Sequence, residues 1–260
     1  CPADVTKPRD TIGAYVATNP APGTREWPGF KPTPVWLTPE SSTDEALSVM
    51  FFSQIGQHRL EAVRDDDAHA PRGAAIACYL DVAENLEARG GFAQLGGVAY
   101  FAEDSSVVGI WRGGQLFTPD GPPGEISTCS VDSDGVTSCK QVTVGWEHAK
   151  LALRGTLDAV VTVVDHLIGV HFTKSNAFAT ACTESLPQSH PLAEFCTPFI
   201  YRTLHINFAA VLNLASYGSF VPSSTGLSEQ GLKDLFEWGA ENPAGGNAWA
   251  TYPEQWAKQG

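Results

Sequence analysis

Short runs in which hydrophobic and polar residues alternate, and longer runs with helical periodicity, occupy different parts of the chain. Between residues 92 and 144, runs such as "GGVAYFAED" and "EISTCSVDSDGVTSCKQVTV" are separated by Gly, Asp and Pro, which predicts an antiparallel meander of hairpins. Upstream, the capping-box pair Ser42 and Glu45 predicts a helix over residues 43–64. The run "ACYLDVAENLEARGG" predicts a second helix, which its two terminal glycines would end.

Longer helices are predicted after residue 145. The run "WEHAKLALRGTLDAVVTVVDHLIGVHF" lacks proline, and its length favours a helix, although its Val- and Ile-rich second half would by itself suit a buried strand. Thr197 and Pro198 predict the start of the next helix, which ends at Gly218. Its apolar stripe consists of Leu204, Phe208, Val211, Leu212 and Ala215. A shorter helix, "LSEQGLKDLFEWG", would be capped by Ser228.

Composition and charge limit the kinds of molecule that the protein is expected to bind. A chain of 260 residues with 17% charged and 43% hydrophobic residues is typical of a globular protein with a sizeable core. The net charge of −13 argues against nucleic acid and anionic membrane surfaces. The longest apolar run, around residues 157–172, is interrupted by charged residues and histidines, so no transmembrane segment is expected. Phosphate-loop, CxxC and GxSxG motifs are absent from the sequence, which leaves nucleotide, thiol-redox and serine-hydrolase functions without support.

The six cysteines indicate an oxidising compartment. Together with a first residue that is Cys rather than Met, they predict a protein that is secreted or extracytoplasmic. Cys129 and Cys139 flank an Asp-Gly turn signal, which predicts a disulfide across a hairpin. Cys182 and Cys196 could close a second loop, and the sequence leaves the other pairings open.

Two histidines stand five residues apart in "VVDHLIGVHF". On an α-helix, His166 and His171 would diverge by about 140°. A π-bulge would bring positions five apart close together, and Gly169 could ease that widening. The pair is then either two buried histidines with separate local partners or two ligands of one metal.

The surrounding residues decide between these alternatives by resemblance to a family. Lipoxygenases carry a Trp followed by Ala-Lys and, twenty residues after the Trp, the first histidine of an H-x4-H pair that binds iron. Trp146, Ala149-Lys150, His166 and His171 reproduce that order. A His-Pro pair and a helix of the pattern Pro-x-x-x-x-Thr-x-x-Ile-Asn-x-x-Ala follow in the family. The matching residues are His190-Pro191, Pro198, Thr203, Ile206-Asn207 and Ala210.

The resemblance implies a fold and a domain arrangement. It predicts a mainly α fold, namely a lipoxygenase-like helical core with a small antiparallel β meander in the N-terminal half. Residues 1–42 are rich in Pro and Gly, which by itself predicts an extended segment. By resemblance, residues 43–260 would form a partial catalytic domain. Within it, helices and hairpins would occupy residues 43–145, and a helical metal-binding core would occupy residues 146–260.

The resemblance also implies a chemistry. His166 and His171 would hold a non-haem iron, or alternatively manganese. Hydrogen abstraction from a polyunsaturated fatty acid or a similar apolar substrate, followed by addition of O2, would be the reaction. Because the metal centre carries this chemistry, no separate catalytic side chain is expected.

Other polar residues are expected to support the pair or the pocket. Asp158 or Asp165 could orient an imidazole by contacting the ring nitrogen that does not bind the metal. An ion pair or a helix-cap contact is the alternative. Asn207 is expected to brace neighbouring helices through buried hydrogen bonds. Trp146, His190 and His205 complete the set of pocket candidates, although a polar surface position is the favoured interpretation of His205.

The sequence departs from the family in two respects. The Arg that ends the family's Ile-Asn helix is replaced by Val211, and the later metal ligands of the family have no counterpart before Gly260. We therefore expect a second polypeptide, or a cleaved segment, to supply the remaining ligands in a heterodimer. A lipoxygenase-fold enzyme for a non-lipid substrate and a metal-free binding or scaffold subunit are the alternative functions.

Overall fold

The computed structural model describes residues 42–131, 134–216 and 219–242, which belong to two compact units. One unit, here called the sheet unit, contains residues 42–161 and 225–232 of the described chain. The other, here called the histidine unit, contains residues 162–224 and the described residues from 233 onward. Apart from Ser42, the predicted N-terminal segment lies outside the described residues.

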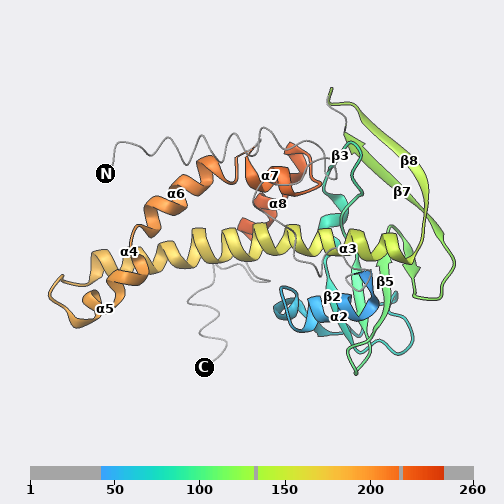
Figure 1. The fold of residues 1–260 in the computed structure, drawn as a ribbon, viewed down its shortest axis with the longest axis horizontal. Coiled ribbons are helices and arrows are strands. Elements are labelled where there is room, and N and C mark those ends of the chain that lie inside the picture. Colours follow the sequence, from blue (N-terminus) through green and yellow to red (C-terminus); the bar gives the residue numbers. More distant parts are fainter. Residues whose placement is uncertain (1–41, 132–133, 217–218, 243–260) are drawn as a thin grey trace. The chain divides into compact units, whose positions relative to one another are not determined.

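A five-stranded antiparallel sheet organises the sheet unit (Figure 1). The strand order is β1-β2-β4-β5-β6. These strands are β1 (Glu61–Ala62), β2 (Ile76–Tyr79), β4 (Val98–Phe101), β5 (Val107–Arg112) and β6 (Gln115–Phe117). All four residues of β4 are buried, because β2 and β5 flank this strand and side chains cover both of its faces.

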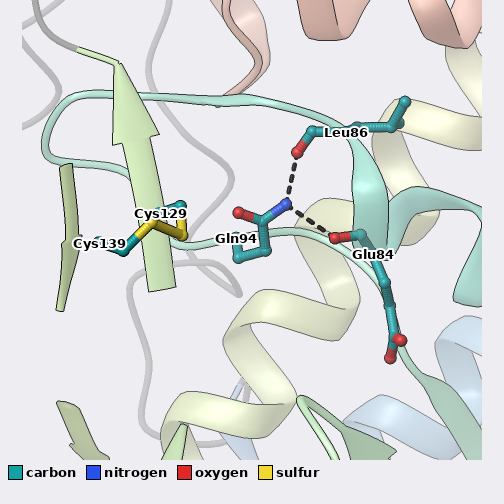
Figure 2. The surroundings of a disulfide bond; sticks show 5 residues. All are labelled: Glu84, Leu86, Gln94, Cys129 and Cys139. Carbon is teal, nitrogen blue, oxygen red and sulfur yellow. Dashed lines mark hydrogen bonds between the residues drawn. A yellow bond between two sulfur atoms is a disulfide. The ribbon is translucent and has the colours of Figure 1, made fainter. Parts of the chain in front are cut away.

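A second sheet contains the long hairpin expected from the Asp-Gly turn. β7 (Gly124–Val131) pairs antiparallel with β8 (Thr137–Val144), and the short β3 (Ala88–Arg89) lies parallel to β7. A disulfide joins Cys129 and Cys139, which are direct partners across the hairpin. Figure 2 shows this bond and the neighbouring Gln94, whose amide donates to the backbone carbonyls of Glu84 and Leu86.

The predicted fold class is wrong. The described residues are about 49% helix and 19% strand, so the chain is not a mainly α, lipoxygenase-like core with a small meander. The main cause is the stretch over residues 77–91, which was predicted to be a helix. Its first three residues belong to β2, which enters the sheet next to β4, and the rest contains the 3-10 turn η4 (Asp81–Asn85) and β3. Burial of Ala77 and Cys78 between neighbouring strands outweighs the local helical preference of this run.

The other predicted helices differ from the structure mainly in their ends. The first is α2 (Asp44–Phe52), capped by the Thr43 hydroxyl, and the short 3-10 helix η3 (Gln57–Arg59) follows it. At Gly56 an added Cβ would lie 2.9 Å from the Phe51 Cα, so the chain turns back on itself there and the helix cannot continue to residue 64. The Ser228 hydroxyl accepts from Gly231 N–H at the start of α8 (Glu229–Glu241), as predicted.

A carboxylate fixes the loop between β1 and β2. Asp67 Oδ2 accepts hydrogen bonds from the hydroxyls of Tyr79, at 2.9 Å, and Tyr100, at 2.8 Å. Partial burial alone would raise the pKa of Asp67, but these bonds and the backbone N–H of His69 outweigh burial and lower it. Burial and the Asp67 carboxylate raise the pKa of Tyr100.

The long helix predicted from Trp146 has two parts with different geometry. α3 (Trp146–Val160) is an α-helix, and η5 (Val161–Ser175) is a π-helix. In the histidine unit η5 is followed by α4 (Asn176–Ser185), α5 (Pro191–Ile200), α6 (Thr203–Asn213) and α7 (Phe220–Ser224). The helix predicted from Thr197 is wrong in its start, because Pro198 lies inside α5 and the chain breaks at Arg202, which has a φ of 57°.

The apolar stripe predicted on that helix does not face a core within the described residues. Four of its five members are exposed by 46–66%, namely Leu204, Phe208, Val211 and Leu212. Further large apolar side chains on α5 and in the turn after it are exposed by 54–69%: Leu192, Phe195, Phe199 and Tyr201. Among the described residues, no helix is both long and apolar enough to cross a membrane.

Candidate metal centre

The π-helix η5 brings His166 and His171 together. A π-helix bonds residue i to residue i+5, so positions five apart lie on one side of it. The two Nε2 atoms are 3.1 Å apart, and the ring centroids are 4.7 Å apart with a ring angle of 78°. The widening that the spacing required is therefore present, and it extends over 15 residues rather than a single turn.

Asn207 on α6 fixes the orientation of His171. Its Oδ1 lies 3.0 Å from His171 Nδ1, and its amide Nδ2 lies 2.7 Å from the carbonyl oxygen of the same residue. Ser175 Oγ at 3.0 Å and Asn176 Oδ1 at 2.7 Å also accept from this nitrogen, so its two hydrogens are shared among three acceptors. Asn207 is 2% exposed, so these bonds satisfy an amide that has little access to water.

The hydrogen-bond directions in this network determine which ring nitrogen of His171 carries a proton. Ser175 Oγ and Asn176 Nδ2 both donate to backbone carbonyls, so their remaining oxygen lone pairs accept from the Asn207 amide nitrogen. The Asn207 oxygen is thereby turned toward His171 and accepts from its Nδ1–H. The lone pair of neutral His171 then lies on Nε2, the atom that faces His166.

The surroundings of His166 favour its neutral form. Partial desolvation and the nearby His171 lower the pKa of His166. Neutral imidazole is the form that binds metals, because the lone pair is free. Two metal–imidazole bonds of about 2.1 Å at roughly a right angle place the nitrogens about 3.0 Å apart. The observed Nε2 separation of 3.1 Å fits two ligands of one ion.

Two histidines do not complete a metal sphere. Within the described ranges, no group of three or more His, Cys, Asp or Glu residues is arranged to hold a metal. His166 is exposed on η5, so the side of the pair away from the helix is accessible. Additional ligands would have to come from water, from substrate or from protein outside these residues.

The other predicted pocket residues have separate positions. His190 caps α5, since its Nδ1 accepts from the Leu192 N–H at 3.1 Å. His205 is exposed on α6, Asp165 is half-buried on η5, and Asp158 lies on an exposed position of α3. Of the predicted residues, the structure brings together His166, His171 and Asn207.

Trp146 belongs to a different polar cluster, at the start of α3. Its Nε1 donates to Asp44 Oδ1 at 2.7 Å, and Lys150 Nζ lies 2.8 Å from the same oxygen. Lys150 is 3% exposed and also contacts the Ser42 carbonyl and Glu147 Oε1. The Trp-Ala-Lys motif therefore ties α2 to α3 within the sheet unit.

Sequence reasoning missed Ser175 and Asn176. Both follow the second histidine within five residues, and a Ser-Asn pair at that distance is a local signal for a polar network. Because their partner lies on α6, about thirty residues later, the contact itself depends on tertiary structure.

No known protein-family model matches the chain, and no curated protein is significantly similar to it in sequence.

Proposed function

We propose that the chain provides two histidine ligands of a non-haem iron centre in an oxidoreductase that acts on an apolar substrate with O2. The observation that carries the proposal is the facing pair of Nε2 atoms on a π-helix, with His171 held by Asn207. The lipoxygenase-like order of Trp146, His166, His171 and Asn207 supports iron over other metals that imidazole binds. Manganese is the alternative ion.

Each residue of the centre would have a defined task. His166 and His171 would hold the ion through Nε2, and Asn207 would keep the Nδ1 proton of His171 in place. Bound iron would supply hydrogen abstraction from an activated C–H bond, as in a polyunsaturated fatty acid, and subsequent oxygenation. The protein would position the substrate and exclude water from its reactive carbon.

A second polypeptide that covers α5 and α6 is part of the proposal. Nine large apolar side chains on these helices and the turn between them are exposed by 46–69%: Leu192, Phe195, Phe199, Tyr201, Leu204, Ile206, Phe208, Val211 and Leu212. Large apolar side chains exposed in such number are typical of an interaction site. α6 also carries Asn207, so a partner on this helix would lie close to the histidine pair and could supply further ligands.

Metal content tests the centre directly. We expect the purified protein to contain stoichiometric iron or manganese by elemental analysis, with a matching electron paramagnetic resonance signal. His166→Ala and His171→Ala should each lose the metal, whereas His205→Ala, which removes an exposed imidazole on α6, should retain it. A metal-free wild-type protein would favour a binding or scaffold subunit instead.

Activity and assembly are tested separately. Oxygen uptake with linoleate, compared with a panel of non-lipid oxidisable compounds, distinguishes a lipoxygenase-type substrate from another one. Native mass spectrometry should show the chain in a complex with a second polypeptide. A stable monomer with full iron content would contradict the need for a partner.

A further inference from the structure

Two reduced cysteines face each other between α4 and α5. Cys182 on α4 is 8% exposed, and Cys196 on α5 is 7% exposed. α4 packs against α5, and Cys196 lies close enough to Cys182 to affect its thiol. The pair is separate from the Cys129–Cys139 disulfide, which lies in the sheet unit.

The short connection between the two helices explains why the thiols meet. α4 ends at Ser185 and α5 begins at Pro191. Cys182 therefore lies about one helical turn before the connection, and Cys196 lies about one and a half turns into the next helix. Residues at similar distances from the connection of a helical hairpin lie at the same level, so Cys182 and Cys196 lie beside each other across the contact between α4 and α5, as a disulfide requires.

We propose that Cys182 and Cys196 are a site of reversible oxidation that forms a second disulfide, between α4 and α5. The oxidant is a small disulfide such as oxidised glutathione. The thiolate of one cysteine attacks it, forms a mixed disulfide and releases one thiol. The thiolate of the other cysteine then attacks the protein sulfur and releases the second thiol. Two S–H protons are lost, the protein sulfurs are oxidised and the small disulfide is reduced.

Burial determines the rates of the two steps. Desolvation and the neighbouring Cys196 raise the pKa of the Cys182 thiol, so little thiolate is present near neutral pH. The first step also needs access for the small disulfide and is therefore slow. The second step is fast, because the two sulfur atoms already face each other. We expect the internal disulfide to appear without accumulation of the mixed form.

The bond would hold together the helices that follow the histidine pair. It would close a loop from Cys182 to Cys196, and α4 begins with Asn176, which contacts Asn207. Restricting the unfolded chain in this loop should stabilise the folded protein. The proposal does not rest on a bound metal, since it requires only the two thiols and an external disulfide.

Peptide mapping of the full-length protein tests the proposal. The folded protein is equilibrated in glutathione buffers of increasing oxidised fraction, free thiols are alkylated, and the peptides are analysed without reduction. We expect a cross-linked peptide pair that contains Cys182 and Cys196 and has lost the mass of two hydrogen atoms. Alkylation of both cysteines under the most oxidising condition, or pairing of either one with another cysteine, would overturn the proposal.

Two variants separate the bond from general effects of oxidation. In wild-type protein the midpoint of thermal unfolding should rise with the oxidised fraction in parallel with the cross-linked peptide. Cys182→Ser and Cys196→Ser keep the Cys129–Cys139 disulfide and should show no such rise. If both variants show the same rise as wild type, a different thiol pair is responsible.

Discussion

Two polar clusters, one around Lys150 and one around His171, differ in how many of their polar groups have partners within the protein. Lys150 contacts three oxygens, from Ser42, Asp44 and Glu147, and Asp44 also accepts from Trp146. The ammonium group is thus held entirely by neighbouring residues. Such a closed cluster stabilises a fold, because its buried charge is paired with neighbouring oxygens.

The cluster around His171 is open at one end. The amide group of Asn207 bonds only to protein atoms. The hydrogen bonds that begin there end at two imidazole Nε2 atoms that face each other, and His166 is exposed. Either one ring donates to the other or both bind a cation between them. Two motifs of one sequence pattern therefore differ in structure, because one satisfies its polar groups internally and the other presents two imidazole nitrogens to each other.

The largest expected effect is on the closed cluster. Lys150→Met removes the buried ammonium and leaves Asp44 and the Ser42 carbonyl without it. Because the side chain of Asp44 is 40% exposed and can gain water, we expect a loss of about 2–3 kcal/mol in the free energy of unfolding, measured by urea titration. Metal affinity of the folded protein should not change.

Lys140→Met is the matched control for this experiment. Lys140 is exposed on β8, and its replacement should change the free energy of unfolding by less than about 0.5 kcal/mol. Equal losses in the two variants would show that Lys150 has no special role in the sheet unit.

The next effect concerns the open cluster. Asn207→Ala removes the acceptor for the Nδ1 proton of His171, so we expect metal affinity to fall by about 10–100-fold in a metal titration. Asn207→Asp keeps an oxygen at this position and should recover part of the affinity. Asn207→Asp should not restore the free energy of unfolding to the wild-type value, because a carboxylate cannot donate to the His171 carbonyl, Ser175 and Asn176.

Asn213→Ala controls for loss of an amide from the same helix. Its Nδ2 donates to the carbonyl of Ala209, away from the histidines. If Asn213→Ala lowers metal affinity as much as Asn207→Ala, the network acts through the stability of α6 rather than through the orientation of His171.

The two clusters also show what the sequence could and could not predict. Helix geometry indicated that His166 and His171 could meet only if the helix carried a π-bulge, a relation that is local in the chain, and η5 is a π-helix. The hairpin with Cys129 and Cys139 was predictable for the same reason. Both depend on neighbours in the sequence and on fixed backbone geometry.

Features that depend on distant partners were not predictable. The run that begins at Ala77 has helical preferences, and only pairing with Val98–Phe101 makes it a strand. Periodicity placed Phe208 in an apolar stripe but could not show what covers that stripe, and Phe208 is exposed. The contact of Asn207 with Asn176 depends on how α6 returns beside η5.

Asp67, Tyr79 and Tyr100 form a second closed cluster. Here we expect a smaller change in the free energy of unfolding, and one that depends on pH. Tyr100→Phe removes one hydrogen bond to Asp67 and should cost about 1–2 kcal/mol at pH 7. The folded protein lowers the pKa of Asp67, so the stability from this carboxylate is present above its unfolded value and is lost as pH falls through the folded value. The difference between variant and wild type should therefore shrink below about pH 4.

Urea titrations from pH 7 to pH 3 measure this difference. Tyr201→Phe, which removes a hydroxyl from a tyrosine that is 66% exposed, should have little effect at any pH. A pH-independent loss for Tyr100→Phe would mean that its hydroxyl stabilises the sheet unit without the charge of Asp67.

The smallest effect compares the α-helical and π-helical parts of the long helix. At Gly155 on α3 an added Cβ would be 3.9 Å from Leu95 Cδ2, so Gly155→Ala should raise the free energy of unfolding by about 0.5–1 kcal/mol. At Gly169 on η5 the Cβ would be 3.3 Å from the Val164 carbonyl oxygen, which is tighter than an ordinary contact. Gly169→Ala should therefore gain nothing or lose stability, since this carbonyl lies five residues earlier and belongs to the π-helical turn. Equal gains at the two positions in urea unfolding would mean that η5 tightens to α-helical geometry without cost, and the facing histidines would then not be a fixed feature of the chain.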